Sequence, residues 1–477
     1  MAVLLLRLMV VVGVLMLGSP TAAAQPAPYA ELDRFVRDRM RALDIPGVAY
    51  AVVEPAGIVH TGTAGVDGAG AAVTDLTPFL WGSAAKPVTA TLITALAEQG
   101  RIQLDAPVVR YLPAFRTRDE ARSARITIRH LLAQTSGFAT STRYTDRTDS
   151  GRKPADVLPE LADAELVSEP GAVHHYSSTN YLILSAVVEA ITGRAFPDVL
   201  TEMVLAPLGM HSAVTDPEGA QRVSRGHRFV FGQAVPFAAP FDPVGVGYGY
   251  LGGTVRDAAA FAAAGLGGVL TEAQRAQKFE GEARTSAGNF YGLGWRRGTL
   301  PDTESPMVWH GGAAPGYFAH VVLLPDRSRA VVLLANAYGT FHEPQLLATG
   351  FGLAQLADGV AAKPDEAGYV YWSILAGLLT LALLLVAANV FGFRSLRREP
   401  GAPMRAVIIA AAWSVGLGAL LYAMSVLVPG HFGVSLGQIV LWAPDIAWLL
   451  YGSVGLAVSL ALLRVAIGIR GVVTRRG

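Results

Sequence analysis

Residues 81–86 read WGSAAK and lead into apolar residues at helical spacing: Val88, Leu92, Ile93 and Leu96. Gly100 ends this pattern, so we expect a helix that stops before it. Ser83 then lies in the first turn, with Lys86 one turn later on the same face. Desolvation would lower the pKa of this lysine and allow it to take the proton of the serine hydroxyl. On its own the pattern is short, and a helix-capping serine beside a solvated lysine is the simpler interpretation.

A second segment, residues 174–181, reads HHYSSTNY and precedes another apolar helix pattern: Leu184, Val187, Val188 and Ile191, with Gly193 as the stop. The phenol of Tyr176 therefore lies on a loop at a helix start, where nearby cations would lower its pKa and allow general acid or base catalysis. A packing tyrosine is the alternative. His174 and His175 are adjacent rather than spaced as metal ligands, and no H-E-x-x-H motif occurs, so we expect no metal site.

A third segment, residues 309–313, reads WHGGA and is followed by two β-rich runs around the polar turn PDRS at 325–328. This arrangement predicts an antiparallel hairpin. Gly311 and Gly312 would allow a substrate to approach the backbone closely. His310 would bind a substrate carboxylate or carbonyl, or would simply be a packed strand residue.

In this order, the three segments resemble the motifs of the serine β-lactamase and penicillin-binding-protein superfamily, specifically its class C-like branch of peptidases, esterases and β-lactamases. The resemblance extends over nearly all of residues 32–336 and includes four further blocks: IPGV at 45–48, HLLAQTSG at 130–137, GGTVRD at 252–257 and YGLGW at 291–295. It implies an α/β (α+β) β-lactamase-like fold, in which helices flank an antiparallel sheet and form an additional subdomain.

The resemblance also implies a role for each motif residue. Ser83 would attack a carbonyl and form an acyl-enzyme, while Lys86 and Tyr176 would share the proton transfers. The backbone N–H groups of Ser83 and Ala313 would form the oxyanion hole. The substrate-binding positions would be Ser178, His310 and Gly312. No cofactor is implied.

Two positions depart from the family pattern. The second motif is usually Y-x-N, and Ser178 replaces the asparagine that helps to hold a substrate amide. The third motif often begins with a lysine that attracts a carboxylate, and here it begins with His310. We therefore do not expect efficient β-lactam hydrolysis, whereas amide or ester cleavage stays open.

The composition is uneven along the 477 residues, which are 52% hydrophobic and only 16% charged. Residues 25–366 hold 29 Lys and Arg against 35 Asp and Glu, whereas residues 367–477 hold eight Arg against two acidic residues. The overall charge of +1 argues against a nucleic-acid partner. The absence of cysteine excludes a disulfide scaffold, a thiolate metal site and a cysteine nucleophile.

The amino-terminal residues 1–24 resemble a secretory signal, with one Arg7, an apolar run and small residues before Gln25. An uncleaved anchor is the alternative. Residues 25–366 then form one extracytoplasmic domain. Within it, the polar stretch at 141–154 is expected to be an exposed loop or lid.

Residues 367–477 contain three apolar runs, which predict transmembrane helices at about 369–393, 406–428 and 441–463. Three buried core helices are the alternative, but they would leave almost no polar face for water. Asp445 is the only acidic residue within these runs and is expected to start a helix or to pack, so a transporter is not indicated.

The loops between the runs predict their orientation. The loop after the second run has no charged residue. Arginines follow the first run, at Arg394, Arg397, Arg398 and Arg405, and the third run, at Arg464, Arg470, Arg475 and Arg476. By the positive-inside rule, these arginines and the C-terminus are cytoplasmic. The hydrolase domain is then periplasmic, and the protein is a multi-pass protein of the cell (inner) membrane.

This organisation resembles the membrane-bound periplasmic peptidases of the colibactin-maturing type, which activate acylated prodrugs. The resemblance implies a membrane-anchored serine peptidase that removes an N-acyl-amino-acid cap, with Ser178 bonded to the cap. The alternatives are a D-Ala-directed carboxypeptidase, a β-lactamase, an esterase or a catalytically silent membrane sensor. The expected partners are the lipid bilayer and a small-molecule, acylated-peptide or peptidoglycan-like substrate, without nucleic acid. The sequence indicates no oligomeric state.

Overall fold

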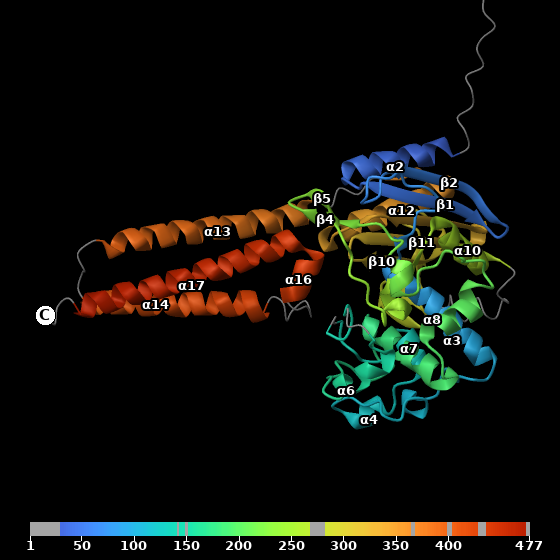
Figure 1. The fold of residues 1–477 in the computed structure, drawn as a ribbon, viewed down its shortest axis with the longest axis horizontal. Coiled ribbons are helices and arrows are strands. Elements are labelled where there is room, and N and C mark those ends of the chain that lie inside the picture. The colour runs from blue at the N-terminus through green and yellow to red at the C-terminus, as the bar shows by residue number, and fades with distance from the viewer. Residues whose placement is uncertain are drawn as a thin grey trace, which may run out of the picture.

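The computed structural model describes residues 29–140, 143–147, 151–267, 282–363, 368–397, 403–427 and 436–473. The expected signal segment therefore lies outside the described residues. Figure 1 shows a globular body from which three long helices extend side by side.

An eight-stranded antiparallel sheet forms the centre of the globular body, in the order β2-β1-β12-β11-β10-β9-β8-β7. Its strands are β1 (Gly47–Glu54), β2 (Gly57–Gly65), β7 (Ala283–Ser286), β8 (Asn289–Tyr291), β9 (Arg296–Thr299), β10 (Pro306–Ala314), β11 (Tyr317–Leu324) and β12 (Arg329–Ala335). The predicted hairpin is confirmed, because β11 pairs with β12 across the turn η6 (Pro325–Arg327).

Both faces of the sheet are covered, which explains why β1 and β11 are buried along nearly their whole length. On one face, Val48 and Val52 pack in a cluster with residues of α2 (Ala30–Ala42) and α12 (Glu343–Ala357). On the other face, Ala49 and Ala51 pack in the larger cluster that includes α10 (Val255–Leu266). Alternate strand residues thus belong to two different cores.

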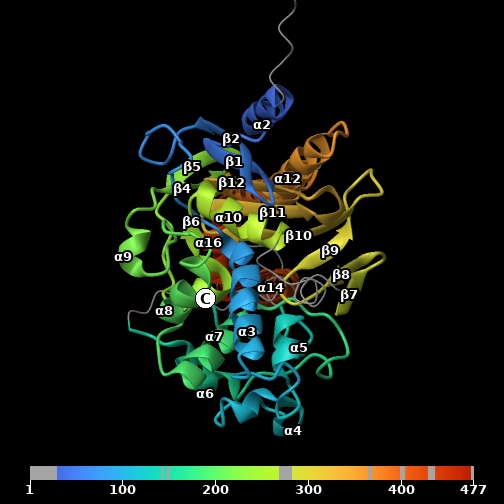
Figure 2. The same ribbon diagram turned by 90° about the vertical axis from the view of Figure 1, so that its right-hand side faces the viewer.

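The second part of the globular body is helical. Figure 2 shows α3 (Ala85–Glu98) leading from the sheet into this part. Its helices are α4 (Glu120–Ser123), α5 (Ile128–Leu132), α6 (Leu158–Leu161), α7 (Ser178–Thr192), α8 (Phe196–Leu200) and α9 (Pro217–Ala220), with shorter turns η1 (Gly82–Ala84), η2 (Val108–Arg110), η3 (Pro154–Val157), η4 (Thr201–Leu205) and η5 (Val246–Tyr250). A further turn, η7 (Thr340–His342), directly precedes α12. Two small sheets pair β3 (Phe79–Leu80) with β6 (Gly252–Gly253), and β13 (Ala337–Tyr338) with β4 (Gly226–Val230) and β5 (Gln233–Phe237). The expected helical subdomain and antiparallel sheet are both present.

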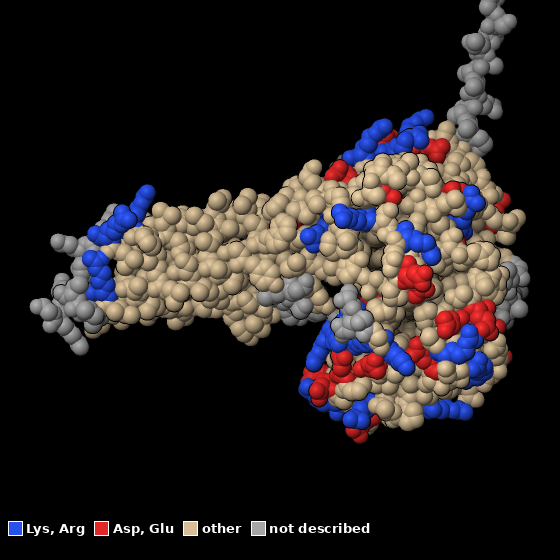
Figure 3. All heavy atoms as spheres, in the orientation of Figure 1, with Lys and Arg blue, Asp and Glu red and all other residues tan. Residues whose placement is uncertain are grey.

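The three long helices match the predicted spans closely, and each is long and apolar enough to cross a membrane. They are α13 (Tyr369–Leu396), α14 (Pro403–Tyr422, continued by η8, Ala423–Leu427) and α17 (Pro444–Val473), with the short α16 (Leu436–Trp442) before α17. Figure 3 shows a shaft whose visible surface is uncharged along most of its length, with basic side chains gathered at its far end. This charge distribution suits helices that are surrounded by lipid.

The prediction of an exposed loop or lid at 141–154 holds only in part among the described residues. Arg143, Gly151 and Lys153 are exposed. Tyr144 and Thr145 are buried, and the carboxylate of Asp146 accepts a hydrogen bond of 3.0 Å from the Tyr250 hydroxyl. The polar composition of this stretch did not predict the exposure of all its residues, because Thr145 and Asp146 form hydrogen bonds inside the protein rather than with water. The described part of this loop packs against the body, and its Asp146 lines the same cleft as Ser83.

Candidate active site

Ser83 lies at the tight entry to α3. It belongs to the 3-10 turn Gly82–Ala84, and α3 begins at Ala85, so the serine precedes the α-helix rather than lying within it. Gly82 has a φ of +54°, in the left-handed region that favours glycine. The chain turns sharply here and presents the serine side chain to a cleft.

Lys86 is fully buried in the first turn of α3. Its Nζ donates hydrogen bonds to Ser83 Oγ at 2.9 Å, to Ser178 Oγ at 3.1 Å and to the carbonyl oxygen of Tyr248 at 2.7 Å. Burial lowers the pKa of Lys86 to about 7, and the Asp146 carboxylate partly opposes this shift. The three donated bonds describe the ammonium form. With a pKa of about 7, a large fraction of Lys86 is the neutral amine at physiological pH, which has two N–H groups and a lone pair that can accept the Ser83 proton. The solvated-lysine alternative is excluded.

Tyr176 lies on the other side of the same serine. Burial raises its pKa to about 12, although the nearby Arg296 guanidinium and a hydrogen bond with Ser83 act in the opposite direction. Lys86 Nζ and the Arg296 guanidinium carbon lie 5.0 Å and 5.2 Å from the centre of the ring. The phenol therefore stays protonated near neutral pH, despite the Arg296 guanidinium beside it.

The third motif approaches Ser83 through its backbone. A Cβ atom on Gly82 would lie 2.4 Å from the peptide nitrogen of Ala313, and one on Gly312 would lie 2.9 Å from the peptide nitrogen of Ser83. Strand β10 and the serine turn thus pack backbone to backbone. Ser83 and Ala313 line the same cleft, which is the arrangement that the expected oxyanion hole requires.

His310 is buried beside this group, and both of its ring nitrogens have partners. Nδ1 lies 2.6 Å from the carbonyl oxygen of Gly311, and Nε2 lies 3.1 Å from the Tyr291 hydroxyl. Burial, with a smaller contribution from Arg296, lowers its pKa well below the usual value. A neutral imidazole does not replace the positive charge of the lysine that often starts this motif. His310 lines the same cleft as Ser83, so its role in binding a substrate carboxylate or carbonyl stays a prediction.

Several residues of the cleft were not anticipated from the sequence, among them Asp146, Arg296, Glu343 and Trp442. Asp146 belongs to the stretch expected to be exposed, and Arg296 directly follows the YGLGW block. A lone arginine or aspartate carries no periodic signal, so only the tertiary structure brings these residues to Ser83. The chain has only four lysines, at positions 86, 153, 278 and 363, and this rarity is a compositional signal that draws attention to Lys86.

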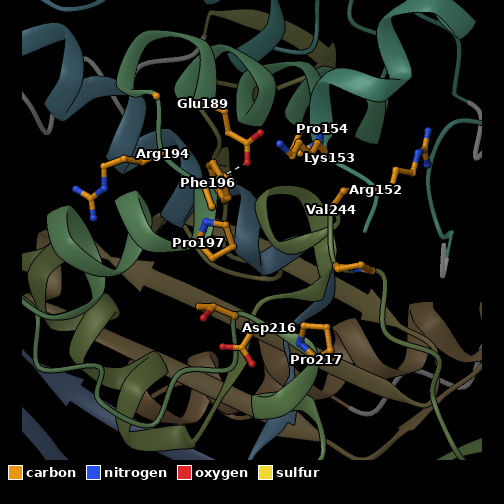
Figure 4. A pocket seen from close by; sticks show the side chains of 14 residues that line it. Arg152, Lys153, Pro154, Glu189, Arg194, Phe196, Pro197, Asp216, Pro217 and Val244 are labelled. Carbon is orange, nitrogen blue, oxygen red and sulfur yellow. Dashed lines mark hydrogen bonds between the residues drawn. The ribbon is translucent and has the colours of Figure 1, made fainter. Parts of the chain in front are cut away.

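The cleft has a volume of about 530 Å³, within the range of small-molecule sites. A second cavity of about 430 Å³ lies elsewhere in the helical part and is lined by Arg152, Glu189, Phe196 and Asp216, among others (Figure 4). It contains none of the motif residues, and Glu189 in it accepts a hydrogen bond of 2.9 Å from the Phe196 peptide nitrogen. Within the described ranges, no group of three His, Asp or Glu side chains is arranged to hold a metal ion.

The fold and the serine–lysine–tyrosine cluster define a serine hydrolase of the β-lactamase and penicillin-binding-protein superfamily. The Beta-lactamase family model matches residues 32–365, and the chain belongs to this family. The resemblance to the superfamily seen in the motifs is thereby confirmed.

Two curated relatives illustrate the similarity. Penicillin-binding protein 4 of Amycolatopsis lactamdurans is 34% identical over 316 residues, which are 61% of this chain and 81% of that protein. Protein flp of Staphylococcus aureus (strain N315) is 22% identical over 315 residues, which are 64% of this chain and 62% of that protein.

Three solved structures share the fold. The octameric penicillin-binding protein homologue of Pyrococcus abyssi has a TM-score of 0.60 at 20% identity, covering 72% of this chain and 81% of its own. The D-stereospecific amidohydrolase of a Streptomyces species has a TM-score of 0.54 at 22% identity, covering 64% of this chain and 94% of that protein. The D-alanine carboxypeptidase AmpC of Burkholderia cenocepacia has a TM-score of 0.57 at 18% identity, covering 69% of this chain and 99% of that protein.

Proposed function

We propose that this protein is a membrane-anchored serine hydrolase that cleaves an amide bond outside the cytoplasm through an acyl-enzyme on Ser83. The observation that carries the proposal is the 2.9 Å contact between Ser83 Oγ and a buried Lys86 whose pKa is lowered to about 7. The three apolar helices and the arginines at their far end support the anchoring and the orientation.

The pKa values of Lys86 and Tyr176 assign a different proton transfer to each residue. Neutral Lys86 takes the Ser83 proton as Oγ forms a bond to the substrate carbonyl carbon, and the N–H groups of Ser83 and Ala313 receive the oxyanion. When the C–N bond breaks, the protonated Tyr176 gives its proton to the leaving amine, and the Lys86 ammonium restores the phenol. Water then hydrolyses the ester and regenerates Ser83.

The substrate that we propose is an exported precursor with an N-acyl-amino-acid cap. Ser178 lines the cleft, and its oxygen accepts a hydrogen bond from Lys86. Its own hydroxyl hydrogen is not used in any contact among the described residues, and it is therefore placed to donate to a carbonyl of the cap. A lipid-bearing cap also suits a hydrolase joined to membrane helices.

A D-Ala-directed carboxypeptidase, β-lactamase or esterase is the second candidate. The observation that favours it is the 34% identity with a protein named as a penicillin-binding protein. The substitutions at Ser178 and His310 weigh against β-lactam turnover, because the usual amide and cation are missing there.

Membranes labelled with a fluorophosphonate and with a fluorescent penicillin separate these candidates. We expect fluorophosphonate labelling that Ser83→Ala abolishes and that Ser177→Ala retains, because the Ser177 hydroxyl has no hydrogen-bond partner among the described residues. We also expect hydrolysis of N-acyl-D-amino-acid amides by the wild type. Rapid penicillin turnover would favour the second candidate, and no Ser83-dependent adduct or hydrolysis would contradict an enzymatic function.

A further inference from the structure

A buried carboxylate, that of Asp445, lies at the junction between the hydrolase and the membrane helices. Asp445, at the start of α17, accepts hydrogen bonds from the Tyr371 hydroxyl at 2.5 Å and from the Phe231 peptide nitrogen at 2.8 Å. The Tyr371 hydroxyl in turn accepts a bond of 2.8 Å from the peptide nitrogen of Gly232, in the turn between β4 and β5. The helices α13 and α17 are therefore fixed to the hydrolase rather than tethered beside it.

Aromatic contacts extend this junction toward the catalytic cleft. The rings of Phe229 on β4 and His342 on η7 stack with centres 3.8 Å apart, and His342 also contacts Tyr371 at 4.7 Å. These contacts connect a strand, a turn of the hydrolase and a membrane helix. The position of α16, which directly precedes α17, is thus set relative to the hydrolase.

Trp442, the last residue of α16, is the point at which the membrane region reaches the cleft. Its ring meets Tyr338 edge to face, with centres 5.5 Å apart. The Tyr338 hydroxyl donates a hydrogen bond of 2.7 Å to Glu343, which holds that ring in place. Trp442, Tyr338 and Leu347 line the same cleft as Ser83.

We infer that Trp442, Tyr338 and Leu347 form a subsite for the long apolar chain of the substrate, between Ser83 and the surface of the bilayer. This inference rests on the proposed function and names the substrate class more narrowly as membrane-held amphiphiles. A tryptophan at the end of a short helix that leads into a span is typical of the membrane–water interface. A chain that passes Trp442 can leave its far end in lipid while its head group reaches the serine.

The alternative is that Trp442 only packs against the hydrolase. Leu347 argues for a continuous apolar wall, because it approaches β10 closely: a Cβ atom on Gly311 would lie 2.8 Å from its Cδ2 atom. One wall of the cleft is thereby shared by the third motif, by α12 and by the membrane region. A site for small water-soluble peptides would not require a wall residue from the membrane region.

The test compares ethyl and dodecyl fluorophosphonates on the full-length protein in liposomes of phosphatidylcholine. These probes react with an activated serine whatever bond the enzyme cleaves. The readout is the ratio of the two second-order rate constants for Ser83 modification, dodecyl over ethyl. Because partitioning of the dodecyl probe into lipid is the same for every variant, differences in this ratio report on the protein.

We expect Trp442→Ala to lower the ratio about tenfold, which corresponds to the loss of contact with one or two methylene groups. Trp448→Ala is the matched control, because Trp448 is exposed on α17 and does not line the cleft. Leu347→Thr gives a second test on a different helix, should Trp442→Ala fail to fold.

An unchanged ratio in Trp442→Ala and Leu347→Thr would overturn the subsite, and so would an equal loss with both probes. Those results would leave the proposed function standing, since Ser83 would still react. No Ser83-dependent modification by either probe in the wild type would instead overturn the proposed function, and the subsite with it.

Discussion

A Cβ atom on Gly312 would lie 1.9 Å from the carbonyl oxygen of Trp81. Strand β10 and the turn that carries the proposed nucleophile therefore meet at a separation that no larger residue tolerates. Gly82 makes the reciprocal approach, because its Cβ would lie 2.4 Å from Ala313. Two glycines that are more than two hundred residues apart thus set the spacing between Ser83 and Ala313, the two expected oxyanion donors.

Gly312→Ala is expected to disrupt catalysis and to cost stability. The extra methyl group must push β10 away from the serine turn, which costs about 1–3 kcal/mol of the free energy of unfolding. Displacing Ala313 from the oxyanion position should reduce the rate of Ser83 acylation by about 100-fold. Fluorophosphonate labelling rates and thermal unfolding measure the two effects. Gly219→Ala is the control, since its Cβ would make only ordinary contacts of 3.4 Å or more.

Acylation of Ser83 is expected to depend on pH through Lys86. The pKa of Lys86 is lowered to about 7, and only the neutral amine accepts the serine proton. The labelling rate should rise with pH, with a midpoint near 7, and level off above it. Lys86→Met should remove this rise and reduce the rate by about 1000-fold. A pH-independent rate in the wild type, or a rise retained in Lys86→Met, would contradict the assignment of Lys86 as the base.

Two charged residues of the cleft should move this midpoint in opposite directions. The Arg296 guanidinium lowers the pKa of Lys86, and the Asp146 carboxylate raises it. Arg296→Gln is therefore expected to shift the midpoint of the labelling profile to higher pH, and Asp146→Asn to shift it to lower pH. Arg297→Gln, on the adjacent exposed side chain, is the control and should leave the midpoint unchanged. Shifts of the same sign in both cleft variants would show that these charges do not act on Lys86.

The parts of the site that could be predicted are those encoded locally. Ser83 and Lys86 are three residues apart, in a 3-10 turn and in the first turn of the helix that follows it, so local geometry brings their side chains together. Tyr176 stands directly before α7, where the apolar pattern and the stop at Gly193 are clear. The roles of these residues came from the order of three motifs along the chain rather than from any one of them.

The parts that could not be predicted depend on contacts between distant segments. The place of Asp146 in the cleft could not be predicted from its polar stretch, because its partner, Tyr250, lies about a hundred residues away along the chain. The neutral state of His310 follows from its burial and from Arg296, neither of which a sequence pattern reports. The membrane helices were predicted from their composition, but the placement of Trp442 in the cleft required the packed junction.

The carboxylate of Asp445 should contribute measurably to the hydrolase–membrane junction. Asp445→Ala leaves the Phe231 peptide nitrogen and the Tyr371 hydroxyl without their acceptor, which is expected to cost about 1–3 kcal/mol of the free energy of unfolding. Thermal unfolding of the full chain in detergent measures this loss, and faster proteolysis in the turn between β4 and β5 would locate it. Ser453→Ala is the control on the same helix: its buried hydroxyl has no partner among the described residues, so its removal leaves no other group without a hydrogen bond and should not destabilise the protein. Equal stability of Asp445→Ala and wild type would mean that the Asp445 carboxylate does not contribute to holding α13 and α17 to the hydrolase.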